Sequence, residues 1–428
     1  MTQFPGPADF RAAMAALGLA APPAAWRDGW AESQAAYPAD GPAFLREGFV
    51  RDLAARLGLE ADVRGAIVGL LATFEARPVL RRLAWHCHRV LFAGPADNAA
   101  DFAPVELPWP TRPVELPPWG EAFYAPVLLS GGPGLLALHA ARGIPAEVTR
   151  DTVSDLGLWM RHYRAHTGRW GLAEAGWLAN HFLGRLHKLG RLQFRFERFA
   201  SGFHAYRHAE TGRVLLLAPG GARFRRDGQF DGATGVRDEA AWVSTFSAGP
   251  SVVRGHPVSP DGRTLPAPMA LGTDRWRPIL QEGDPVLGVH IPATGAMAHA
   301  ACGASFRRAV GFFGRHFPQF GYKAFHCASW FLDNQLGELL PEASNIRRFQ
   351  EEVYLYPLPG ASDGATFDRV FGRRYADLAD APRDTALRRE IVRHVQAGGH
   401  FHGGGCLLFP EDLDWGGRVY RRSRDLGV

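Results

Sequence analysis

Residues Val286 to Phe317 read VLGVHIPATGAMAHAACGASFRRAVGFFGRHF, and this stretch decides the fold. Its apolar start predicts a buried strand over Val286–Ile291, with His290 at the strand's end. A loop of small residues follows, and the next predicted helix, Ser305–His316, carries a basic face. Two interpretations are open at this point. The loop is either a plain connection, or it wraps a phosphate group while His290 faces a reaction.

Strands and helices continue to alternate on both sides of this stretch. Upstream, a period-two pattern begins near Leu192 and predicts a meander of strands with turns at Ser201–Gly202 and Thr211–Gly212. Downstream, YKAFHCASWFL, YLYP and HFHGGGCLLFP are predicted strands, and SNIRRFQEEV and DTALRREIVRHVQAG are predicted helices. The second half of the chain therefore predicts a mixed sheet flanked by helices.

The first half of the chain has the three- and four-residue apolar spacing of helices. FVRDLAARLGLEADVRGAIVGLLATF and EARPVLRRLAWHCHRVLFAG both show it. A proline-rich connector follows at about 94–120, and the helical pattern resumes from Ala122 to about Lys188. The uncharged stretch Ala122–Ala141 is long enough to span a bilayer. Because Pro126 and the GGPG run interrupt it, we predict a buried helix there and no membrane span.

Together these patterns predict an α+β fold with two domains, a helical N-terminal domain over 1–189 and an α+β domain over 190–428. The 428 residues are 46% hydrophobic and 21% charged, which is the composition of an ordinary globular protein. The first residues lack the basic start and apolar run of a signal peptide. Four cysteines are widely spaced without a CxxC pair, which indicates a reduced, cytoplasmic protein.

Positive charge is concentrated in one region of the chain. Between Arg161 and Arg198, seven arginines and one lysine stand against two glutamates. Since no nucleic-acid-binding motif accompanies them, a small phosphorylated ligand or an acidic carrier protein fits better than nucleic acid. Arg185, Lys188 and Arg191 are the candidate contacts, and a solvated surface is the alternative.

Two histidine pairs raise the question of a metal. His86 and His88 diverge on a helix. His400 and His402 would share a strand face, but no third ligand lies at motif spacing. We therefore expect no metal.

Five motifs occur in an order that resembles a known family. They are WGLAEAGWLANHFLGRLHKLGRLQFRF, GHPVSPDGR, HIPATGAM, FHCASWFLD and LLPEASNIRRFQ. On these motifs, the second half resembles the GNAT-like C-terminal domain of bacterial acyltransferases, and the first half resembles their helical N-terminal domain. The resemblance implies transfer of an acyl group from acyl-CoA or acyl carrier protein to an amine of a small molecule or peptide, in specialised metabolism.

The resemblance also assigns ligand contacts. It places the pyrophosphate of CoA on the loop and helix start that contain Thr294, Gly295, Gly303 and Ser305, and the pantetheine on Asn345. The loop lacks the Q/R-x-x-G-x-G/A pattern of the superfamily, and Phe349 stands where an aromatic hydroxyl is expected. A GNAT-like protein that binds a ligand or partner without catalysis is therefore the alternative function.

Acylation of an amine needs a base, and His290 is the first candidate because its ordinary pKa lies near neutrality. The alternative is a buried histidine bound to backbone. His326 is a second candidate catalytic histidine and lies on the next predicted strand, where alternation turns Cys327 to the opposite face. Cys327 could form an acyl-cysteine with His290 as base if the two strands are adjacent, although buried cysteines are usually structural.

Overall fold

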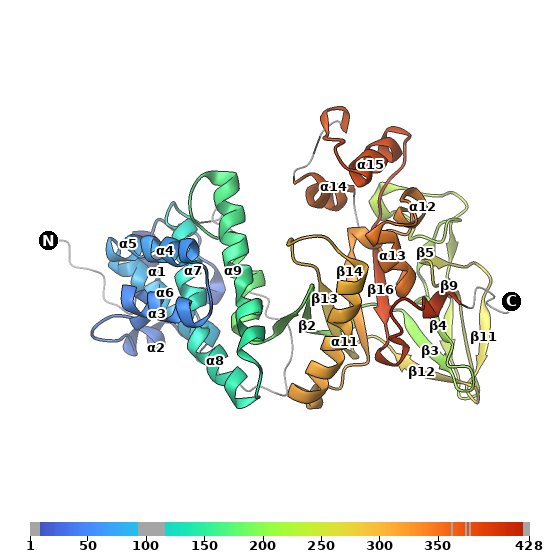
Figure 1. Cartoon of the computed structure of the whole chain (residues 1–428), viewed down its shortest axis with the longest axis horizontal. Helices are drawn as coiled ribbons and strands as arrows, with labels where there is room; N and C mark the ends of the chain where they lie inside the picture. The colour runs from blue at the N-terminus through green and yellow to red at the C-terminus, as the bar shows by residue number, and fades with distance from the viewer. Residues whose placement is uncertain (1–8, 93–115, 361–362, 373–374, 376–377, 423–428) are drawn as a thin grey trace. The chain divides into compact units, whose positions relative to one another are not determined.

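The structure is a computed structural model that describes residues 9–92, 116–360, 363–372, 375 and 378–422, drawn in Figure 1. The chain divides into two compact units. Unit 1 consists of Met1–Leu189, Gln193–Phe196 and Gly314–Gln319. Unit 2 consists of Gly190–Leu192, Glu197–Phe313 and Phe320–Val428. Most of the predicted proline-rich connector, residues 93–115, lies outside the described residues.

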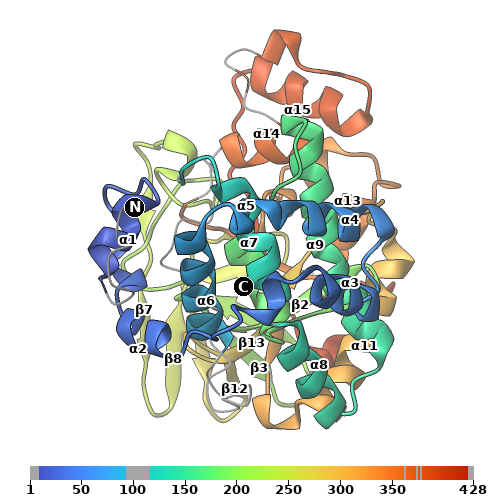
Figure 2. The same cartoon turned by 90° about the vertical axis from the view of Figure 1, so that its left-hand side faces the viewer.

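Unit 1 is helical, and Figure 2 faces its helices. The helix α7 lies at the centre of its core, since nine of its ten residues are buried. The helices are α1 (Phe10–Ala16), α2 (Trp30–Ala35), α3 (Glu47–Arg56), α4 (Ala61–Leu70), α5 (Ala72–Glu75), α6 (Pro78–Phe92), α7 (Gly120–Leu129), α8 (Gly132–Ala141), α9 (Ala146–Thr167) and α10 (Ala175–Phe182).

The apolar stretch Gly120–Ala141 is long and apolar enough to cross a membrane by composition alone, but 72% of its most apolar window is buried inside the protein. It forms two helices rather than one, because α7 ends at Leu129 and α8 begins at Gly132. The prediction of a buried helix with an interruption is confirmed for this stretch.

The end of the helical region differs from the prediction. The helix α10 ends at Phe182, and the strand β1 occupies Leu186–Leu189. Gly184 causes the change, because its φ of +65° is a left-handed conformation that terminates a helix. The prediction of helix up to about Lys188 is therefore wrong, and Arg185 and Lys188 flank or belong to a strand.

Unit 2 is built on a mixed sheet and an antiparallel sheet. In the mixed sheet, β13 (Pro285–His290), β14 (Ala324–Ser329), β16 (Gly404–Leu408) and β15 (Tyr354–Tyr356) are neighbours in this order. The first two strands are parallel, and the later pairs are antiparallel. The antiparallel sheet has the order β10 (Arg263–Thr264), β9 (Pro257–Ser259), β4 (Val214–Leu217), β3 (His204–His208) and β12 (Trp276–Leu280).

Smaller elements complete unit 2. The strand β2 (Leu192–Arg198) contributes residues to both units. A three-stranded sheet consists of β11 (Met269–Gly272), β8 (Val252–Gly255) and β7 (Phe246–Ala248), and β5 (Arg223–Phe224) pairs with β6 (Trp242–Val243). The helices are α11 (His299–His316), α12 (Leu336–Leu339), α13 (Asn345–Glu352), α14 (Asp363–Phe371) and α15 (Ala386–Gln396).

The helix after β13 starts earlier than the sequence predicts. The helix α11 begins at His299, six residues before the predicted start at Ser305. Its first turns contain alanine at several positions, and alanine is the strongest helix former. The loop between β13 and α11 is therefore limited to residues 291–298, and Gly303 and Ser305 belong to the helix.

Unit 1 contains a buried carboxylate held by an imidazole. Nε2 of His181 lies 3.2 Å from Oδ2 of Asp155, and both side chains are at most 3% exposed. Trp177 donates its indole N–H to the same carboxylate oxygen over 3.2 Å. Burial alone raises the pKa of Asp155, but the bonds and charge of His181, with further bonds from Gln193 and Trp177, lower it overall.

Replacing His181 with alanine should therefore destabilise the protein strongly. Breaking a buried pair leaves an uncompensated charge, which costs about 3–5 kcal/mol of unfolding free energy. The exposed pair Arg51–Glu47 is the control, and Arg51→Ala should cost no more than about 0.5 kcal/mol. Urea unfolding at pH 7 measures both. Because the pKa of Asp155 is lowered on folding, this stabilisation should be present above about pH 4 and fall below it. Equal losses of unfolding free energy in His181→Ala and Arg51→Ala would contradict a stabilising buried pair of His181 and Asp155.

Candidate active site

Four strands of the mixed sheet present one face on which polar side chains gather. Gly288 of β13 lies opposite His326 of β14 in the parallel register. Side chains alternate along a strand, so His290 lies on the same face as Gly288. Gly405 of β16 lies opposite Tyr356 of β15 and extends this face. The strands thus bring His290, His326 and Tyr356 to one surface of the sheet.

Glu197, near the end of β2, joins the two histidines. Its Oε1 lies 3.1 Å from Nε2 of His290, and its Oε2 lies 3.8 Å from Nδ1 of His326. The first distance is a hydrogen bond, whereas the second is an ion-pair distance. The side chain of His290 is 32% exposed and that of Glu197 is 14% exposed. His290 is thus the member of this group that is most accessible to a substrate.

Two glycines make room for these side chains. A Cβ atom at Gly288 would lie 2.1 Å from the carboxylate carbon of Glu197. A Cβ atom at Gly405 would lie 2.2 Å from Cζ of Tyr356. Any other residue at either position would displace the polar side chain above it, because real Cβ atoms do not approach this closely.

Tyr356 fixes the second histidine. Its Oη lies 2.7 Å from Nε2 of His326, within hydrogen-bonding distance. Phe199 packs edge-on against both rings, with centroids 5.5 Å from His326 and 6.2 Å from Tyr356. Burial raises the pKa of Tyr356 well above its ordinary value, so the phenol stays protonated at neutral pH. The neutral side chains of Tyr356 and Phe199 therefore hold the His326 ring on two sides.

Cys327 lies on the opposite face of β14. It faces Cys406 across the antiparallel pair, and both thiols are free and buried. Burial raises the pKa of the Cys327 thiol well above its ordinary value, which disfavours the thiolate that a nucleophile requires. The strands β13 and β14 are adjacent, but the structure does not bring Cys327 together with His290.

Arg191 organises the loop that follows His290. Its guanidinium donates three hydrogen bonds of 3.0 Å, from Nε to the Ala296 carbonyl, from Nη1 to Pro292 and from Nη2 to Gly295. Within the described residues, no protein acceptor binds the backbone N–H groups of residues 294–301. A loop whose carbonyls turn to one cation, followed by a helix N-terminus, presents N–H groups to an anion.

The other predicted loop contacts have different surroundings. Thr294 and Gly295 lie in the loop, where Gly295 has a φ of +68°. Ser305 is buried in α11, where its Oγ accepts from the Arg191 amide over 2.8 Å and donates to the Ala301 carbonyl over 3.0 Å. A Cβ atom at Gly303 would lie 2.3 Å from the indole ring of Trp415. Gly303 and Ser305 thus pack α11 against its neighbours.

The remaining predicted residues have partners of their own. The backbone N–H of Lys188 donates to Thr152 Oγ1 over 3.0 Å, and Arg185 lines a cavity of unit 1. Asn345 is the first residue of α13 and is half-buried. Phe349 is buried and packs against Phe306, Phe331 and Trp415. Tyr354 carries the nearest aromatic hydroxyl after Phe349 in the chain, and this hydroxyl donates to the Val258 carbonyl and accepts from the Leu216 amide.

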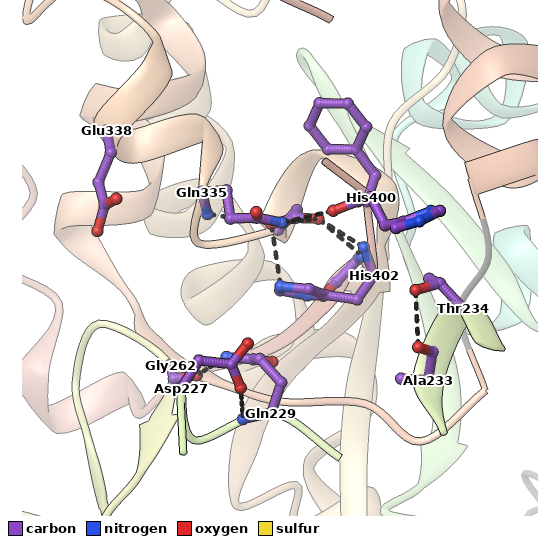
Figure 3. Close-up of polar contacts among 12 residues, drawn as sticks. Asp227, Gln229, Ala233, Thr234, Gly262, Gln335, Glu338, His400 and His402 are labelled. Atoms are coloured by element: carbon purple, nitrogen blue, oxygen red, sulfur yellow. Dashed lines mark hydrogen bonds and ion pairs between the residues drawn. The ribbon is translucent and has the colours of Figure 1, made fainter. Parts of the chain in front are cut away.

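A second polar cluster precedes β16, and Figure 3 shows Gln335, His400 and His402 at this turn. Buried Asp333 accepts from the backbone N–H of His402 over 2.7 Å and of Gln335 over 3.0 Å. His400 bonds to Asp363 instead. The prediction of a shared strand face for His400 and His402 is wrong, because both lie ahead of β16. In the described ranges, no three His, Cys, Asp or Glu side chains are grouped to hold a metal ion.

Comparisons with known proteins agree with this architecture. Residues 48–184 match the N-acyltransferase N-terminal domain, and residues 186–408 match the GNAT-like C-terminal domain. No curated protein matches the chain. The matches confirm the predicted α+β class and the resemblance inferred from the five motifs.

Solved acyltransferase structures share the fold over nearly the whole chain. An acyltransferase in complex with decanoyl-CoA has a TM-score of 0.62 at 24% identity, over 94% of this chain and 99% of that chain. An acyltransferase in complex with decanoyl-CoA and teicoplanin has a TM-score of 0.60 at 24% identity, over 93% of this chain and 98% of that chain. An acyltransferase mutant in complex with octanoyl-CoA has a TM-score of 0.61 with the same identity and coverage as the second.

Proposed function

The chain belongs to the acyltransferases that join an N-acyltransferase N-terminal domain to a GNAT-like C-terminal domain, and we propose that it transfers an acyl group from acyl-CoA to an amine. The observation that carries this proposal is the position of His290. It stands at the end of β13, bonded to Glu197, directly before a loop of unpartnered N–H groups in the described part of the chain. A base and an anion site are thereby adjacent in sequence.

In this proposal His290 is the base of the reaction. A carboxylate only accepts hydrogen bonds, so neutral His290 donates its Nε2–H to Glu197 and takes up a proton at Nδ1. The amine nitrogen attacks the thioester carbonyl, and the C–N bond forms as the carbonyl π pair moves to oxygen. His290 removes a proton from the nitrogen. The carbonyl then re-forms and the C–S bond breaks. The departing CoA thiolate takes up a proton from solvent, and protonated His290 returns its proton to solvent, so the net proton count is zero.

Glu197 is the positioning residue. Its negative charge stabilises the imidazolium that forms on His290 in the transition state. Its second oxygen faces His326, which Tyr356 holds from the other side. The carboxylate is therefore fixed between two rings, and it fixes the orientation of His290 in turn.

We assign binding of the acyl donor, acyl-CoA, to the loop between β13 and α11. The N–H groups of residues 294–298 and of the first turn of α11 suit the diphosphate of CoA. Thr294 and Gly295 belong to this cradle, and Asn345 remains the candidate for a pantetheine contact. The complexes of structural relatives with decanoyl-CoA and octanoyl-CoA support acyl-CoA as the donor.

The molecule that accepts the acyl group is defined here by its chemical class. The amine belongs to a small molecule or a peptide, and the teicoplanin complex of a structural relative supports an amine-bearing glycopeptide in particular. An acyl carrier protein is the other possible donor, and Arg185 and Lys188 are its candidate contacts because their charge complements an acidic surface.

Replacing Arg191 with methionine should weaken CoA binding at least tenfold. The substitution removes three charge-assisted bonds to the loop carbonyls, and one such bond contributes about 1.5 kcal/mol, which is roughly tenfold in affinity. Isothermal titration calorimetry with free CoA measures the effect. The control is Arg277→Met, which removes an exposed arginine of β12.

Wild-type affinity in Arg191→Met would show that the loop is not the CoA site. If the wild-type protein binds no CoA compound but accepts an acyl group from a carrier protein, the donor is the carrier protein and the acyl-CoA assignment is wrong.

A further inference from the structure

Unit 1 contains a cavity that the proposed chemistry does not use. Its volume is about 650 Å³, and every lining residue belongs to unit 1. This volume lies within the range of small-molecule sites, about 300–1,000 Å³. Aromatic and aliphatic side chains form most of the wall, among them Phe44, Trp85, Phe92, Leu135, Leu138 and Phe317. An apolar wall of this kind suits an aliphatic ligand.

The histidine in this wall is uncharged. His88 lies among Phe44, Trp85 and Phe92, with ring centroids 5.1–5.9 Å away. Burial, with a smaller effect of the Arg89 charge, lowers the pKa of His88 to about 4. Ser130 donates its hydroxyl to the Val127 carbonyl over 2.5 Å, so Nδ1 of His88 is the donor in its 2.7 Å bond to Ser130. Its Nε2 therefore carries a lone pair and only accepts hydrogen bonds.

The charged groups of the wall are mostly cations. Arg46, Arg142 and Arg185 line the cavity, and Asp40 is the one acidic side chain among the described lining residues. Arg46 donates Nη2 to the Asp40 carbonyl rather than to a carboxylate. An apolar cavity lined by three arginines and one aspartate complements an amphiphile that has a hydrocarbon chain and an anionic end.

We propose that this cavity binds the hydrocarbon chain of a medium- or long-chain acyl ligand that carries an anionic end. A fatty acid and an acyl-CoA share this chemistry. The inference rests on the cavity itself, and the proposed acyl transfer only adds a reason to expect such a ligand. The N-terminal unit then contributes recognition of chain length.

Gly134 offers a way to fill the cavity without disturbing the fold. It lines the cavity from α8, and a Cβ atom there would meet no other atom within 4 Å. Gly65 in α4 is a matched control, because it is also an exposed helical glycine with open space around its Cβ position and does not line this cavity. Gly134→Trp should therefore occupy the site, whereas Gly65→Trp should not.

The experiment measures the affinities of octanoate, decanoate, CoA and decanoyl-CoA for the full chain by calorimetry. Decanoate should bind the wild-type protein roughly tenfold more tightly than octanoate, because two more methylenes are buried. Gly134→Trp should lower the affinity for decanoate at least tenfold and leave the affinity for free CoA unchanged. Gly65→Trp should change neither affinity. If decanoyl-CoA also loses affinity in Gly134→Trp, acyl-CoA is the source of the chain. If only decanoate loses affinity, the ligand of the cavity is the free fatty acid.

Two results would overturn the inference. One is decanoate affinity that Gly134→Trp does not change, and the other is affinity that does not depend on chain length. Failure of the proposed function has a different signature, since decanoate would then bind while CoA binds to no variant.

Discussion

Replacing His290 with alanine should lower kcat for acyl transfer by about 10²- to 10⁴-fold, the usual contribution of a general base. The affinity for acyl-CoA should stay unchanged, because the imidazole acts on the amine and not on the diphosphate. Steady-state kinetics over a range of acyl-CoA concentrations separates the two quantities. Added imidazole should restore part of the turnover, an effect that a purely structural histidine would not show.

The matched control for this substitution is His208→Ala. His208 is a half-buried histidine of β3 that packs edge-on against Trp276. Its removal should leave kcat unchanged. Wild-type turnover in His290→Ala would remove His290 from the mechanism.

Replacing Glu197 with glutamine should lower kcat by on the order of 10²-fold, a loss typical of a misaligned reacting group. The amide keeps the size of the side chain but loses the charge that stabilises protonated His290. The rising limb of the pH–rate profile should therefore move to lower pH, because protonation of the imidazole becomes less favourable. A profile that does not move would show that the carboxylate has no part in orienting or stabilising the base.

Gly288→Ala tests the same carboxylate without removing a polar group. The new Cβ atom would lie 2.1 Å from the Glu197 carboxylate carbon, so the side chain must shift and turnover should fall. Gly311→Ala is the control, because a Cβ atom at this position of α11 meets nothing within 4 Å. Loss of turnover in both variants would contradict a specific contact between Gly288 and Glu197.

The fold was predictable where hydrophobic period and length agree. The strand predicted over Val286–Ile291 is found at Pro285–His290, because a short apolar run next to a small-residue loop has few alternatives. The two boundaries that failed have physical causes. At His299 the small residues form helix, since alanine favours helix even without an apolar stripe. At Gly184 a left-handed glycine ends the helix although the leucine spacing continues.

The site was predictable only in part. His290 and His326 stand out as histidines on apolar strands, but Glu197 is 93 positions away from His290 in the chain, and no local pattern links them. Two features of the sequence nevertheless point to Glu197. Alternation along β2 puts Glu197 on the polar side of its strand, and Gly288 interrupts an apolar strand, which is typical of a close approach by another group. No feature of the sequence singles out Tyr356, because aromatic residues are common in buried strands.

Acyl transfer by the full chain can be measured directly. The full chain is incubated with decanoyl-CoA and a series of amine-bearing glycopeptides and peptides, and mass spectrometry follows the acylated amine while a thiol reagent follows free CoA. If His290 is the base of an amine acyltransferase, the amide product forms in equal amount to the released thiol, and His290→Ala loses both. Binding of decanoyl-CoA without amide formation on any amine would contradict this function, and the chain would then be a GNAT-like binding protein without catalysis.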